Sequence, residues 1–139
     1  MRHSYLFAIL FAPFVSVCQK TTPRLDNDTV YTSCGYKIYA GAILTFGTPS
    51  GSMNHFRFVK IYSSDHGHLS GKRVLVKKIN GVTVSGIGNA YVHIIGSILY
   101  KDGTTDRINL ALNFDEAIKE QEGKPAELIV PDDCKIKNM

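Results

Sequence analysis

The stretch Gly41–Ser63, GAILTFGTPSGSMNHFRFVKIYS, decides the fold class of this chain. Two runs of β-forming residues, Ala42–Phe46 and Phe56–Ser63, flank a segment of turn formers, Gly47–Asn54. This order predicts a hairpin of two antiparallel strands with a long connection. The second run is apolar on both faces, which is typical of a central strand or of a strongly bent strand in a small barrel.

Further strands are predicted on both sides of this stretch. Ala90–Tyr100 and Asp106–Phe114 alternate in polarity around an Asp-Gly turn, Lys101–Thr104, and predict a second hairpin. Thr29–Tyr39 and Arg73–Asn80 are also β-rich, and Glu127–Val130 is a candidate last strand. The glycine-rich segment Gly81–Asn89 is either a flexible loop or a short bulged strand.

One short helix is predicted over Phe114–Glu122. Asn113 is placed to cap it, with Glu116 three residues later as in a capping box, and Gly123 would end it. We therefore predict a mainly β domain of five to seven strands, a small antiparallel SH3-like or otherwise partly open β-barrel with this helix at an open end. A β-sandwich is the alternative.

The N-terminal segment has the pattern of an export signal. Arg2 precedes the apolar run Tyr5–Val17, which is shorter than the roughly 20 residues that span a membrane. Val15–Cys18 is similar to a lipobox, which predicts acylation of Cys18 and a lipid anchor in the membrane. Cleavage just after Cys18, with simple secretion, is the alternative.

The predicted organisation follows from this segment. Residues 1–18 form the signal, 19–28 a polar linker, 29–130 a single β domain and 131–139 a polar tail. The protein is therefore expected in the periplasm or at the outer membrane, or else secreted. The chain has 16 Lys and Arg against 12 Asp and Glu, dispersed along the sequence. This dispersion and the export signal argue against nucleic acid as a partner.

Cys34 and Cys134 lie near the two ends of the domain. In an oxidising compartment such a pair forms a disulfide, which would close a loop of about 100 residues and stabilise the fold by up to about 4.7 kcal/mol. Two unpaired thiols are the alternative. Their spacing excludes a CxxC redox pair.

The densest cluster of polar side chains is Asp65, His66 and His68. These side chains are a possible zinc or copper site if His55 or His93 joins them, and an exposed polar loop is the alternative. The sequence has no GxSxG elbow. We predict no catalytic residue and no cofactor, so an enzyme is the less favoured class.

Aromatic residues on the predicted strands are candidate ligand contacts. Tyr36, Tyr39 and Tyr91, with His93, would line a face that binds a glycan or a peptide, although tyrosine also packs in ordinary strands. The favoured function is a non-enzymatic binding or structural module of the cell envelope with a protein, peptide or glycan partner. The alternative is a metal-binding protein or an enzyme that uses the Asp65/His66/His68 loop.

The motifs GAILTFG, FRFVKI and NFDEAI, with Glu120 and Glu122 close behind, carry a resemblance. The chain resembles small, uncharacterised, exported or lipid-anchored β-rich proteins of Bacteroidetes over Tyr36–Gly123. The resemblance implies a β-rich domain that ends in a strand and a short helix. It implies no activity and no functional residue.

Overall fold

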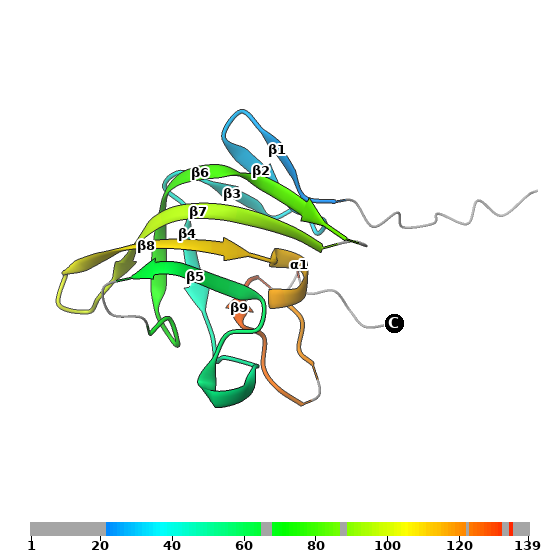
Figure 1. Ribbon diagram of the computed structural model, residues 1–139. Helices are drawn as coiled ribbons and strands as arrows, with labels where there is room; N and C mark the ends of the chain where they lie inside the picture. Colours follow the sequence, from blue (N-terminus) through cyan, green and yellow to red (C-terminus); the bar gives the residue numbers. More distant parts are fainter. Residues whose placement is uncertain (1–21, 65–67, 87–88, 122, 132–133, 135–139) are drawn as a thin grey trace, which may run out of the picture.

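The protein is mainly β, with one curled sheet that forms a half-barrel (Figure 1). The computed structural model describes residues 22–64, 68–86, 89–121, 123–131 and 134. The six-stranded antiparallel sheet has the order β5-β8-β7-β6-β4-β9, and a separate sheet has the order β1-β2-β3. The predicted partly open β-barrel with one short helix is confirmed.

The elements follow one another along the chain with short connections, except around β5 and between α1 and β9. They are β1 (Arg24–Asp26), β2 (Thr29–Tyr31), β3 (Lys37–Tyr39), β4 (Ile43–Phe46), the 3-10 helix η1 (Ser52–Asn54), β5 (Val59–Ser64), β6 (Arg73–Ser85), β7 (Asn89–Leu99), β8 (Thr105–Leu112), α1 (Phe114–Ala117) and β9 (Leu128–Ile129).

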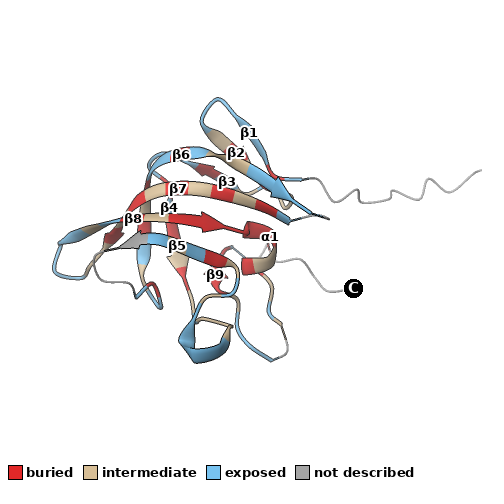
Figure 2. Ribbon diagram, in the orientation of Figure 1, coloured by how far each residue is buried: buried red, intermediate tan, exposed pale blue. Residues whose placement is uncertain are grey.

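The hairpin of β7 and β8 is the centre of the sheet, as the alternating pattern predicts. Val92, Ile94 and Ile98 of β7 are at most 1% exposed and face the core. Gly96 lies on the same face of β7 as these residues. A Cβ at this position would come within 2.7 Å of the Leu75 carbonyl oxygen, so the close approach of β6 and β7 requires glycine. Figure 2 shows this alternation as buried and half-buried bands along β7.

The hairpin predicted for Gly41–Ser63 is wrong. β4 pairs with β6 and β9, whereas β5 pairs with β8 at the opposite edge of the sheet. The segment between them, residues 47–58, is long enough to carry the chain from one side of the half-barrel to the other. β5 is therefore an edge strand, and its register shifts between Ile61 and Ser63, so of the two expectations the bent strand is the one observed.

A buried carboxylate holds this long connection in place. Glu127 is 1% exposed and accepts hydrogen bonds from the Ser50 backbone N–H (2.9 Å), the Ser50 hydroxyl (2.6 Å), the Arg57 N–H (2.6 Å) and the Phe58 N–H (2.8 Å). Four donors compensate the cost of burying the charge. The segment before β9 is thereby tied to both ends of the loop that contains η1.

The predicted helix is shorter than the sequence suggests. α1 has four residues, Phe114–Ala117, and the predicted Asn113 cap makes no side-chain capping bond. Asn113 instead donates to the Asn89 side chain at 3.4 Å, because the residue is buried at the end of β8 beside β7. Phe114 and Ala117 are fully buried, so the short helix serves mainly to pack these side chains into the core.

One segment predicted as a linker, and one predicted as either a loop or a short bulged strand, belong to strands. Arg24–Asp26, within the predicted linker, forms β1 and pairs with β2 across a two-residue turn in which Asn27 and Asp28 have φ of 45° and 62°. Paired positive φ values in Asn and Asp are typical of a type I′ hairpin turn. The glycine-rich segment after Asn80 is the bulged strand of the two alternatives, because β6 continues to Ser85 with register shifts on the way.

Candidate functional site

The side of the six-stranded sheet that turns away from the core forms a continuous surface over β5, β8, β7 and β6. Paired residues of antiparallel strands lie on the same face, so the register defines this surface from the side chains that alternate with the buried ones. We call it the outer face. Its members are Lys60, Tyr62, Arg73, Leu75, Lys78, Thr83, Tyr91, His93, Ile95, Ser97, Leu99, Arg107, Asn109 and Ala111.

Aromatic and cationic side chains meet in one part of the outer face. The rings of Tyr62 and His93 are stacked, with centroids 6.3 Å apart and planes at 20°. The Lys60 ammonium lies 4.6 Å from the centroid of Tyr91, a cation–π contact. A hydrogen bond of 2.8 Å joins His93 Nε2 and Thr83 Oγ1. These contacts form two groups, Tyr62–His93–Thr83 and Lys60–Tyr91, which lie side by side because Thr83 and Tyr91 are paired in the ladder.

Small residues make this cluster possible. β8 separates β5 from β7, so the stacked rings must meet above it. In the row of His93 the neighbours are Ala111 on β8 and Gly81 on β6, neither of which projects above the sheet. Ala111 faces outward and is nevertheless fully buried, because the larger side chains lie over it. The small side chain of β8 therefore leaves room for the two rings to stack across it.

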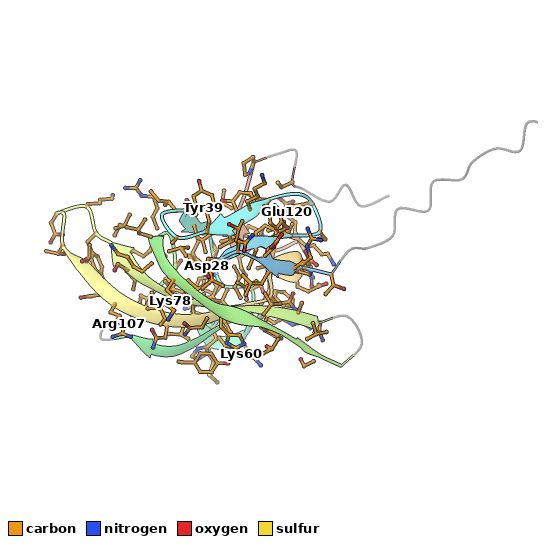
Figure 3. The ribbon with its side chains drawn as sticks, turned by 90° about the horizontal axis from the view of Figure 1, so that it is seen from above. Asp28, Tyr39, Lys60, Lys78, Arg107 and Glu120 are labelled. Atoms are coloured by element: carbon orange, nitrogen blue, oxygen red, sulfur yellow. The ribbon has the colours of Figure 1, made fainter. Side chains whose placement is uncertain are left out.

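The outer face is positively charged. Lys60, Lys78 and Arg107 project from it, together with Arg73 at its end. The only acidic residue in β5–β8 is Asp106, which is paired with the buried Ile98, faces the other side, and accepts a hydrogen bond from Tyr100. Figure 3 shows the three labelled cations on the side of the molecule away from Tyr39 and Glu120.

The four predicted binding residues fall into two groups. Tyr91 and His93 lie together on the outer face. Tyr36 instead stacks on Phe114 with centroids 5.4 Å apart, and Tyr39 is 49% exposed on β3 in the other sheet. Burial, and then charge on Cys134, Tyr39 and Cys34, raise the pKa of Tyr36. Tyr36 is thus a packing residue, not part of the same surface.

The predicted metal site is not assembled by the described side chains. His68 lines a cleft of about 720 Å³ together with His55 and apolar residues such as Phe56 and Leu69. His93 lies on the outer face instead. Asp65 and His66 lie outside the described residues. In the part of the chain that the structure describes, no three His, Cys, Asp or Glu side chains form a group that could hold a metal ion.

The structure describes both cysteines of the predicted disulfide but not Cys18, the predicted anchor. Cys34 is half-buried with its Sγ 3.5 Å from Thr32 Oγ1, Cys134 is buried, and both are cysteines without a disulfide here. Cys18 lies outside the described residues. Over the described ranges, no helix combines the length and the apolar character needed to cross a membrane.

Comparison of the chain with protein-family models, curated proteins and solved structures found no match. The candidate site therefore stands on its own geometry. Sequence reasoning identified Tyr91 and His93 but missed Lys60 and Tyr62. The alternation of side chains in β5 puts Lys60 and Tyr62 on one side of that strand. It assigns them to the outer face only once β5 is known to pair with β8.

Proposed function

We propose that this protein is a non-enzymatic binding module presented outside the cytoplasm, and that the outer face is its ligand surface. One observation carries the proposal: cations and aromatic rings share one face of the sheet, and no carboxylate among its members neutralises them. Such a face attracts acidic ligands over long range and offers rings for close contact. The exported location rests on the N-terminal signal pattern.

The exposure of the cluster supports this role. Tyr62 is 63% exposed, so much of its side chain is open to a ligand. The cations Lys60, Lys78 and Arg107 are exposed as well. A ligand on this face would meet charge and ring surface together, which is the composition that protein binding sites favour.

The geometry favours binding over catalysis. The Thr83–His93 hydrogen bond has the distance of a nucleophile and a base, but it lies on an outward-curved surface open to water. Acid–base and nucleophilic catalysis require a site that orients the substrate and excludes water. We interpret the bond as the contact that fixes the His93 ring against Tyr62.

The test compares baits in a pull-down from cell-envelope extracts. The wild-type chain should enrich a component that the variant Lys78→Gln/Arg107→Gln does not retain. The matched control is Arg24→Gln/Lys37→Gln, which removes two cations that flank the Tyr31 ring on the other sheet at 5.7 and 5.4 Å. Equal enrichment by all three baits, or no enrichment together with turnover of a small substrate, would refute the proposal.

A metal-binding protein or an enzyme is the second candidate, supported by the shared cleft of His55 and His68. It predicts stoichiometric zinc or copper in elemental analysis of the purified chain. The ion should then be lost on His66→Ala and on His68→Ala, whereas His93→Ala on the outer face should retain it. A metal-free protein that still binds its ligand would favour the first candidate.

A further inference from the structure

We infer that the ligand of the outer face is an acidic polysaccharide, a linear glycan with repeated carboxylate or sulfate groups. This inference rests on the proposed function and adds the chemical class of the ligand. It follows from the spacing of the cations, from which aromatic rings are exposed, and from one hydrogen-bond acceptor without a partner among the described residues.

The cations are spaced for a polymer. Lys60 lies in the row of His93 on β5, Lys78 in the row of Ile95 on β6, and Arg107 in the row of Ser97 on β8. Strands about 4.8 Å apart and rows about 6.7 Å apart place these three Cα atoms roughly 12–16 Å from one another. A chain that carries a charge at each repeat could contact all three where they stand, whereas a single phosphate would have to draw the three side chains together.

The rings suit a sugar better than a stack of bases. Tyr62 has one side against His93, and Lys60 lies over Tyr91. Binders of single-stranded nucleic acid stack successive bases on several open rings. Here Tyr62 is the strongly exposed ring of the cluster, which is enough for the apolar face of one sugar unit to pack against it.

An unused acceptor on the outer face also points to a hydroxyl-rich ligand. Asn109 is paired with Ile95 on this face, and its side-chain oxygen is shielded from water without a hydrogen-bond partner among the described residues. Buried polar atoms nearly always have a partner. A sugar hydroxyl that reaches this oxygen would supply the missing donor.

A membrane surface fits the outer face less well. Proteins that dock on anionic lipid insert protruding apolar side chains below the headgroups. Among the described residues, the exposed large hydrophobic side chains are Leu25, Tyr39, Ile43, Met53, Tyr62, Val84 and Ile129. Of these, Tyr62 lies on the outer face, where Leu75, Ile95 and Leu99 are half-buried between their neighbours. Ile43 and Ile129 lie on the same side of the sheet, but on β4 and β9, outside the part that carries Lys60, Lys78 and Arg107.

The experiment measures binding of the full chain to four probes in turn: polygalacturonate, heparin, a single-stranded DNA oligonucleotide and vesicles of anionic phospholipid, with dextran as the neutral polysaccharide. We expect saturable binding to polygalacturonate or heparin that weakens with salt. Lys78→Gln/Arg107→Gln should raise the Kd about tenfold or more, and Tyr62→Leu should raise it several-fold at constant charge. Arg24→Gln/Lys37→Gln, with the same change in net charge, should leave it within about twofold.

Each other outcome overturns the inference in its own way. Equal losses in the two double variants would mean attraction to net charge alone. Binding to DNA or to vesicles that is tighter than binding to either acidic polysaccharide, and that Lys78→Gln/Arg107→Gln abolishes, would assign another ligand class. Binding of none of the four probes would remove the acidic glycan but leave the proposed function standing if the envelope pull-down still depends on Lys78 and Arg107. The substituted side chains are exposed. Circular dichroism spectra and melting curves of each variant that match those of the wild type exclude misfolding.

Discussion

Glu127 shows how one residue can organise distant segments of this small domain. Its carboxylate accepts hydrogen bonds from Ser50, Arg57 and Phe58, which lie on both sides of η1. The main chain adds a bond from the Gly47 N–H to the Glu127 carbonyl oxygen at 2.8 Å. The long loop between β4 and β5 is therefore tied to the segment before β9, although the two are far apart in sequence.

We predict that Glu127→Gln destabilises the fold. The amide replaces one acceptor oxygen by a donor, which must then face backbone N–H groups or leave them unpaired, at a cost of about 3 kcal/mol in the free energy of unfolding. Urea denaturation of both proteins measures it. Glu120→Gln, at an exposed position, is the control and should change stability little. A loss of less than about 1 kcal/mol for Glu127→Gln would show that the carboxylate is dispensable.

Asp102 in the β7–β8 turn should titrate below its usual range. Its side chain accepts hydrogen bonds from the Thr104 hydroxyl (2.6 Å) and the Thr104 N–H (2.9 Å). These bonds hold the pKa of Asp102 below its usual value of 3.8. The folded pKa is lowered, so the stabilising contribution is present above the unfolded pKa and is lost as the pH falls through the folded one.

The check for Asp102 is an NMR titration of its carboxyl group in the wild type and in Thr104→Val. We expect the variant's midpoint to move back toward the usual value while staying below it, because the backbone N–H still donates. In urea unfolding, the wild type should exceed the variant in stability at neutral pH, and this difference should shrink in strong acid. An unchanged midpoint would mean that the hydroxyl does not act on this carboxylate.

At the scale of elements, the sequence predicted what local patterns determine. The β7–β8 hairpin alternates cleanly and closes through a tight turn with Gly103 at φ 85°, so both its register and its buried face were predictable. The strand partners of β4 and β5 were not predictable. Both segments have the composition of paired strands, but composition does not determine which strand each one pairs with. Distant contacts decide that: the Asn113 N–H donates to the Phe58 carbonyl oxygen at 2.9 Å and places β5 beside β8.

The candidate site shows the same division. Tyr91 and His93 lie two positions apart on one strand, so alternation alone placed them on a common face. Lys60 and Tyr62 belong to the site only because β5 pairs with β8, and Arg107 and Lys78 join through the same sheet order. Dispersed charges in the sequence therefore become a basic surface in the fold. Tyr36 lies apart from this surface because it stacks on Phe114 at the start of α1, and its role in ligand binding stays a prediction.

For the whole molecule, the pairing of Cys34 with Cys134 stays a prediction. Cys134 belongs to the hydrophobic core against which Cys34 and Tyr36 pack, although the structure does not join the two cysteines. A disulfide requires their Cα atoms to approach within about 7 Å and would fasten the C-terminal segment to the three-stranded sheet. Mass spectrometry of exported protein under non-reducing conditions should find the bridged peptide, and a reductant should lower the melting temperature. Two free thiols in periplasmic protein would contradict this.

The mode of presentation is decided by Cys18. β1 begins at Arg24, so an acylated Cys18 would hold the folded domain on a tether of only a few residues, far shorter than the linker predicted to reach residue 28. The domain would then stay next to the membrane, and the outer face would have to meet glycans of the adjoining envelope layer.

We expect wild-type protein to take up lipid label and to fractionate with membranes, and Cys18→Ala to lose the label. Cys34→Ala is the control and should keep both properties, because its thiol lies within the folded domain. Unlabelled wild-type protein that is soluble in the periplasm would establish simple secretion, and full-length protein in the cytoplasm would refute export altogether.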